Sequence, residues 1–193
     1  MSEPLQRVPQ MVSSSVAEPV LVPDVGVVFA MLPPAQLAAR WRELYEDPSS
    51  PDRFELDAYG DIVPMNAPKM PHQRVVLSIQ RQLLEQLGGE PLPGLGILTP
   101  RGVFIPDVAW SPRFASDEDP QTTAPPLCVE VQSESNTRRE LDEKVRAYFA
   151  AGSREVVLIE LGGRIRHFGP DGETEKSAFG LELTLPEGPY RRD

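Results

Sequence analysis

Hydrophobic positions in the first half of the chain follow helix spacing, then strand spacing, then helix spacing again. A first helix is predicted from Pro34 to the turn-forming residues 46–52, because apolar side chains recur there at helical spacing: Leu37, Trp41, Leu44 and Tyr45. Residues 53–65 alternate in two short runs around Tyr59 and Gly60, which is typical of a β-hairpin. A second helix, within residues 67–89, has the clearest apolar stripe: Val76, Ile79, Leu83 and Leu87.

The second half of the chain shows the same change of spacing. Residues 97–110 contain two strand-like runs that turn at residues 100–102, and residues 127–133 form a short, strongly apolar strand. An amphipathic helix is predicted within residues 133–152, with these side chains inward: Leu141, Val145, Tyr148 and Phe149. Residues 155–169 have the pattern of a strand, a Gly-Gly turn and a strand, followed by a second turn. This order predicts an α/β sheet with helices packed on it.

The N-terminal segment differs from the rest of the chain. Residues 1–35 are rich in proline and show no periodicity until Val25, so we expect a disordered or loosely docked tail. Its apolar stretch, residues 19–32, would pack on a partner subunit or form a short edge strand if it were ordered. The predicted organisation is therefore a tail over residues 1–35 and one domain over residues 36–193.

Composition limits the class of protein. With 193 residues, of which 40% are hydrophobic, the chain is long enough for one domain with a sizeable core. A single cysteine, Cys128, and the lack of a signal peptide or a long apolar run favour a cytoplasmic protein with no membrane span. The net charge of −10 argues against a general nucleic-acid coat, but it does not exclude a nuclease whose carboxylates bind a metal.

Two carboxylates interrupt apolar strand patterns. By the two-residue period, Asp107 shares a strand face with Val103, Ile105 and Ala109. In the same way Glu130 lies on one face with Cys128 and Gln132, while the other face is apolar: Leu127, Val129 and Val131. An isolated buried carboxylate costs roughly several kcal/mol, and two on neighbouring strands repel each other. A divalent cation would remove both penalties, although for Asp107 alone a turn or strand-end role is as good an interpretation.

Three further ionisable residues lie beside the predicted core. Lys144 falls at the edge of the buried stripe that starts at Leu141, where a long side chain can lean towards the end of the sheet. The alternative is a surface lysine paired with Glu140 one turn away. His72 lies at the start of the second helix on its inward face, where a histidine that only packs is the commoner case. Glu55 alternates with apolar residues in the hairpin and means little by itself.

Five segments in order resemble one nuclease family. Pro106-Asp107 and Glu130-Val131-Gln132 resemble the PD-(D/E)XK nuclease pattern, with Gln132 in the place of its lysine. A lysine displaced to the next helix, as at Lys144, is similar to the branch called the Uma-two family of restriction endonucleases. From Arg53 to the C-terminus, the successive motifs look like those of that family: RFELDAYGDIVPM, PHQRVV, FIPDVAW, CVEVQSESNTRRELDEKVRAYFAAG and EVVLIEL.

The resemblance implies a fold, a metal site and partners. The fold would be a restriction-endonuclease-like core, with a mixed central β-sheet flanked by α-helices. By similarity, Asp107, Glu130 and the backbone carbonyl of Val131 would hold one or two Mg²⁺ ions, with Mn²⁺ as a substitute. The partners would be DNA, bound locally because the chain is acidic, and a second copy of the chain, since nuclease folds of this kind often act as homodimers.

The resemblance also implies roles for three side chains, and the chain departs from the family pattern at three positions. Lys144 would orient the attacking water or stabilise the transition state, Glu55 would be an outer or second-metal ligand, and His72 would contact the water or a phosphate. Gln132 replaces the family's usual leucine, and Glu134 replaces its usual proline and adds negative charge at the mouth of the site. Asp61 replaces the glutamate that usually closes the hairpin motif, which keeps the charge but shortens the side chain. These departures put DNA affinity in question more than metal binding.

Two functions from different classes are consistent with the sequence. The first, which we favour, is a metal-dependent DNA endonuclease. The second is a non-catalytic nuclease-fold module for binding or assembly, which the net charge of −10 and the apolar N-terminal stretch keep open. A small-molecule enzyme is a distant third, because the chain has no Gly-rich phosphate-binding loop and no nucleophile elbow.

Overall fold

The computed structural model describes residues 19–22, 26–188 and 190. Residues 1–18 and 23–25 of the predicted tail lie outside the described residues. The described part of that segment contains a two-stranded antiparallel hairpin of β1 (Pro19–Val22) and β2 (Gly26–Phe29). Among the helices of the described residues, none has the length and apolar character needed to cross a membrane.

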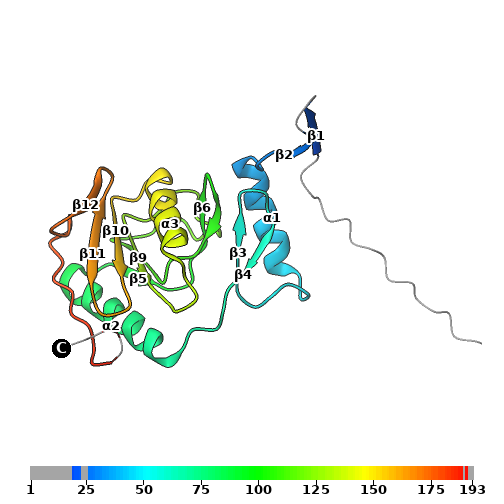
Figure 1. Cartoon of the computed structure of the whole chain (residues 1–193). Helices are drawn as coiled ribbons and strands as arrows, with labels where there is room; N and C mark the ends of the chain where they lie inside the picture. Colours follow the sequence, from blue (N-terminus) through cyan, green and yellow to red (C-terminus); the bar gives the residue numbers. More distant parts are fainter. Residues whose placement is uncertain (1–18, 23–25, 189, 191–193) are drawn as a thin grey trace, which may run out of the picture.

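The centre of the fold is a six-stranded sheet with strand order β12-β11-β10-β9-β8-β5 (Figure 1). Its strands are β5 (Glu90–Leu92), β8 (Val108–Ser111), β9 (Leu127–Val131), β10 (Glu155–Ile159), β11 (Ile165–Gly169) and β12 (Gly172–Thr174). In the described residues β9 and β10 are the parallel pair, and the other neighbours are antiparallel. A parallel pair needs a crossover, which α3 (Arg138–Ala150) provides. The predicted mixed sheet is confirmed.

Two helices cover opposite faces of this sheet, and the alternation along β9 explains how. The side chains of Leu127, Val129 and Val131 pack in one core cluster with α2 (Met70–Leu87). The side chain of Cys128 points the other way and packs with α3. Glu130 belongs to the α3 side, where its carboxylate is buried. The two-residue period seen in the sequence therefore places one carboxylate inside the fold, as predicted.

A second, four-stranded sheet has the order β4-β3-β7-β6. Its strands are β3 (Phe54–Asp57), β4 (Ile62–Pro64), β6 (Ile97–Thr99) and β7 (Gly102–Phe104), and β3 and β4 form the predicted hairpin. The helix α1 (Pro34–Glu46) packs against it through Leu37, Trp41 and Leu44. Tyr45, which was included in the predicted apolar stripe, is 68% exposed. It lies one residue after the buried Leu44 and so points to a different side of the helix, where its ring stacks on that of Trp41.

The segment from Val103 to Ala109 is not one strand, so the strand face predicted for Val103, Ile105, Asp107 and Ala109 is wrong. The strand β7 ends at Phe104 in the four-stranded sheet, and β8 starts at Val108 in the six-stranded sheet. Pro106 lies between them and has no N–H to donate to a ladder, which favours a break there. The crossing chain places Asp107 between the two sheets.

Gly102 is the tightest contact between β7 and β3, and its substitution should disturb the four-stranded sheet. Its φ is +135°, and a Cβ there would lie 1.9 Å from the backbone oxygen of Leu56. We expect Gly102→Ala to lower the free energy of unfolding by about 3 kcal/mol or more, because strain and overlap add. Gly94, with φ +70° and open space around it, is the control, and Gly94→Ala should lose only about 1 kcal/mol. Urea unfolding measures both, and equal losses would contradict the overlap.

Candidate active site

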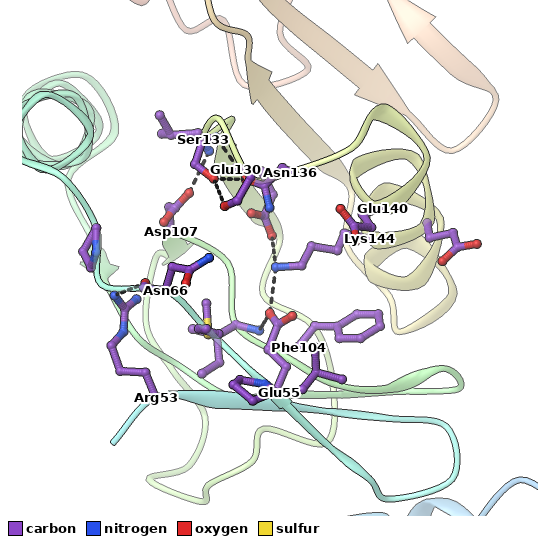
Figure 2. A pocket seen from close by; sticks show the side chains of 18 of the residues that line it. Arg53, Glu55, Asn66, Phe104, Asp107, Glu130, Ser133, Asn136, Glu140 and Lys144 are labelled. Carbon is purple, nitrogen blue, oxygen red and sulfur yellow. Dashed lines mark hydrogen bonds and ion pairs between the residues drawn. The ribbon is translucent and has the colours of Figure 1, made fainter. Parts of the chain in front are cut away.

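A cavity of about 1100 Å³ opens where the two sheets meet the first turns of α2 and α3 (Figure 2). Its lining comes from β3, from the crossing segment after β7, from β9 and from both helices. All six residues that the sequence indicated line this one cavity: Glu55, His72, Asp107, Glu130, Val131 and Lys144. The fold thus brings together side chains that lie up to 89 positions apart in the chain.

Lys144 joins the two sheets across the cavity (Figure 2). Its Nζ donates to Glu55 Oε1 at 2.7 Å and lies 3.3 Å from Glu130 Oε1. Glu140, the surface partner considered from the sequence, instead completes a capping box with Thr137 at the start of α3. Burial lowers the pKa of Lys144, but the charges of Glu130 and Glu55 outweigh it and hold that pKa above its usual range. Lys144 is therefore a buried, protonated cation.

Glu130 receives a second contact that the sequence analysis did not assign. The hydroxyl of Tyr148 donates to Glu130 Oε1 at 2.6 Å, and the tyrosine is fully buried. The sequence showed Tyr148 only as part of the apolar stripe of α3. The available signal was its position one turn after Lys144, which turns both polar ends towards the same carboxylate.

Burial has a marked effect on the charge of Glu130. It raises the pKa of this carboxyl from 4.5 to about 7, against the opposing effects of the Lys144 charge and the Tyr148 hydrogen bond. The negative charges of Asp107 and Glu55 add to the increase. Glu130 therefore gains or loses its proton near neutral pH, which is typical of groups at functional sites.

Asp107, His72 and Val131 form a second group on the opposite side of the cavity from Lys144. The backbone N–H of Val131 donates to Asp107 Oδ2 at 2.8 Å. His72 Nε2 lies 3.1 Å from the carbonyl oxygen of Val131 and 3.3 Å from Asp107 Oδ2. Burial lowers the pKa of His72, yet the hydrogen bond and charge of Asp107 raise it above its ordinary value of 6.5. Nδ1 of His72 is enclosed without a partner, so the polar contacts of the ring with the described residues are those of Nε2 with Val131 and Asp107.

The three carboxylates share a pattern of partners that fits a cation. In each of them all protein contacts fall on a single oxygen, which is Oε1 of Glu55, Oδ2 of Asp107 and Oε1 of Glu130. Their second oxygens have no partner among the described residues, and they are absent from the polar atoms enclosed without one. Three carboxylates that each keep one open, hard oxygen donor line the same cavity, and such donors suit a divalent cation such as Mg²⁺.

The protein's own side chains do not make a complete cage. In the described part of the chain, no group of three or more His, Cys, Asp or Glu side chains is arranged to hold a metal ion. Mg²⁺ commonly uses one or two carboxylates and takes its other ligands from water and substrate phosphates. The pair Asp107 and Glu130, with the second lone pair of the Val131 carbonyl, matches that mode of binding.

Comparisons with known proteins identify the family of the chain and a similar fold. Residues 41–188 match the model of the family Uma2, described as "Putative restriction endonuclease". The chain belongs to the Uma2 family. A crystal structure of a "putative nuclease belonging to DUF820" from Anabaena variabilis ATCC 29413 is similar in fold, with a TM-score of 0.59 and 16% sequence identity over 76% of this chain and 88% of that chain. A search of curated proteins found no match.

Membership of the Uma2 family confirms the resemblance seen in the sequence, and the structural match confirms the restriction-endonuclease-like fold. Two of the departures of this Uma2 protein from the family pattern, Gln132 and Glu134, have structural explanations. Gln132 extends the pairing of β9, because its N–H donates to Ile159 O and its side-chain oxygen accepts from Leu161 N. Glu134 forms an exposed ion pair with Lys69, so its charge at the cavity mouth is offset.

The hydroxyl of Tyr148 should stabilise this Uma2 protein through Glu130. We expect Tyr148→Phe to lower the free energy of unfolding by about 2 kcal/mol at about pH 8, where Glu130 is ionised. The loss should fall to about 1 kcal/mol at about pH 5, where the carboxyl is protonated. Tyr45→Phe, at a 68% exposed tyrosine, is the control and should change little. Urea unfolding at both pH values measures the difference, and a pH-independent loss would refute the pairing with a charged carboxylate.

The raised pKa of Glu130 makes stability depend on pH. Between pH 4.5 and about 7 the folded protein holds a proton on Glu130 that the unfolded chain releases, so the free energy of unfolding falls as pH rises through this window. Glu130→Gln lacks this proton. The stability of the variant relative to the wild type should therefore increase up to about pH 7 and stay constant above it. Urea titrations of both metal-free proteins test this, and a difference that does not vary with pH would exclude it.

Proposed function

We propose that this protein is a metal-dependent DNA endonuclease that hydrolyses phosphodiester bonds with Mg²⁺, or with Mn²⁺ in its place. The observation that carries the proposal is the pair of open carboxylate oxygens on Asp107 and Glu130, in one cavity with the buried cation Lys144. Family membership supports a nuclease, and the donor set supports the metal.

Each side chain of the site would have a different role in the reaction. Bound Mg²⁺ would supply a water of lowered pKa and neutralise charge on the phosphate. Asp107 and Glu130 would hold the cation, with the Val131 carbonyl as a further ligand, while Glu55 keeps Lys144 in place through the 2.7 Å contact. Lys144, which stays protonated, would stabilise the negative charge that develops on the phosphoryl oxygens. His72 would hold the Asp107 carboxylate and the Val131 carbonyl in position through Nε2 rather than contact the substrate.

Contact with DNA would be local and confined to the rim of the cavity. Besides Lys144, four cationic side chains line the cavity: Arg53, Lys69, Arg101 and Arg139. Lys69 and Arg139 are engaged by carboxylates, whereas Arg53 and Arg101 have no carboxylate partner among the described residues. Few free cations on a chain with net charge −10 predict weak binding with a strong dependence on salt.

Cleavage of supercoiled plasmid DNA tests the proposed function. The wild type should nick the plasmid with Mg²⁺ or Mn²⁺ and lose this activity in excess chelator. Asp107→Ala and Glu130→Ala should lower the rate by more than about a hundredfold, because each removes a direct metal ligand. Glu85→Gln, which alters an exposed carboxylate on α2 without hydrogen-bond partners in the described chain, should cleave like the wild type.

Two results would count against the endonuclease. Equal activity in Asp107→Ala, Glu130→Ala and the wild type would show that the cleavage comes from a contaminant. No cleavage with either metal, together with no Mn²⁺ binding in calorimetry, would favour the non-catalytic binding module. Retained circular dichroism spectra of the variants are needed in both cases, since Glu130 is buried and Asp107 is half-buried.

A further inference from the structure

A segment near the end of the described chain, residues 181–188 with Tyr190, runs along α2 and is here called the C-terminal strap (Figure 1, red). Its leucines alternate, and they pack on the core cluster under α2: Leu181, Leu183 and Leu185. The residues between them present their backbone to the helix. The strap therefore uses the two-residue period of a strand without pairing with any strand of the described chain.

Two glutamines on α2 hold this backbone. Gln82 donates from Nε2 to the carbonyl of Thr184 at 2.8 Å and accepts from the N–H of Thr184 at 2.8 Å. Gln86, one turn later, makes the same two contacts with Glu182, both at 3.0 Å. Each side-chain amide thus pairs with a peptide group as a neighbouring strand would, and the two pairs fix the position of the strap along the helix.

The strap delivers Tyr190 to the candidate active site. The tyrosine is 4% exposed, lines the cavity, and donates its hydroxyl to the carbonyl of Gln132 at 2.7 Å. The N–H of Gln132 donates to Ile159 O at 2.8 Å, so this residue after β9 is held at both its N–H and its carbonyl oxygen. Burial, with the nearby charges of Asp107 and Glu134, raises the pKa of Tyr190, which keeps the hydroxyl protonated and able to donate.

Gln132 follows Val131, and the two peptide groups of Val131 both contact or face the candidate active site. Its N–H orients Asp107, and its carbonyl is a proposed metal ligand that lies 3.1 Å from His72 Nε2. A rotation of the peptide between Val131 and Gln132 would turn that carbonyl away from the cavity. The hydrogen bond from Tyr190 holds the next carbonyl, that of Gln132, and so opposes this rotation.

We propose that Tyr190 is a positioning residue of the active site, held in place by the two glutamine contacts on the strap. It acts through Gln132 on the Val131 peptide and so sets the metal affinity of the site. This inference rests on the proposed function. The strap would then be part of the site rather than a covering of the core alone.

Metal binding is the first test, with Mn²⁺ as the probe. Tyr190→Phe keeps the ring and removes only the hydroxyl, so the thermal unfolding midpoint should fall by only about 2–4 °C, the effect of losing one hydrogen bond. Calorimetry on the full chain should show Mn²⁺ bound about tenfold more weakly, which is the usual effect of losing a group that orients a ligand. Gln82→Ala combined with Gln86→Ala should have the same effect by freeing the strap.

Hydrogen–deuterium exchange is the second test and needs neither metal nor DNA. The N–H groups of Val131 and Gln132 should exchange faster in Tyr190→Phe and in the double glutamine variant. Matched controls are Tyr45→Phe, at an exposed tyrosine, and Gln73→Ala, at an exposed glutamine of α2 without a side-chain hydrogen bond in the described chain. Both controls should behave like the wild type in exchange and in Mn²⁺ binding.

The two tests separate this inference from the proposed function. Unchanged exchange at residues 131–132 in Tyr190→Phe would show that the hydrogen bond of Tyr190 does not hold the backbone there. Faster exchange with unchanged Mn²⁺ affinity would overturn its role in the metal site. If the wild type binds no Mn²⁺, the proposed function fails and the metal role fails with it, while the exchange data still decide whether Tyr190 holds the peptide.

Discussion

The buried contact of Lys144 with Glu55 and Glu130 is the interaction on which the site depends. It connects α3 and the six-stranded sheet to the hairpin of the four-stranded sheet, and so closes one side of the cavity. Burying three charges is costly, and breaking such a group is more costly than never forming it. A chain whose only need was stability would favour apolar residues here, so the arrangement supports the catalytic role proposed for these charges.

Around that contact, the protein satisfies each carboxylate on one oxygen and leaves the other open. Backbone and side-chain donors share this work: Ile105 N–H for Glu55, Val131 N–H for Asp107 and the Tyr148 hydroxyl for Glu130. The same donors fix the orientation of each carboxylate. A site built in this way is rigid on the protein side and free on the cavity side, which is the requirement for binding a cation with retained waters.

The net charge of −10 acquires a more specific meaning in the structure. Part of it is concentrated at the floor of the cavity, where a cation would neutralise it, and part at the rim, where Glu134 and Glu143 engage Lys69 and Arg139. The acidic chain is therefore compatible with a nuclease, provided that DNA is bound through a few contacts. Dependence on salt follows from the same distribution of charge.

Local periodicity in the sequence was enough to determine most elements, the burial of Glu130 on the α3 side of β9, and the position of Lys144 at the edge of a helix face. Only the tertiary structure decided that Lys144 pairs with Glu55, that Asp107 lies at a crossing between two sheets, and that Tyr190 reaches the end of β9. The physical reason is that sequence patterns report only on residues that are near one another in the chain. Spacing along a strand or helix sets the face of a residue, whereas the meeting of residues far apart in the chain depends on sheet register, on the break at Pro106 and on packing between layers.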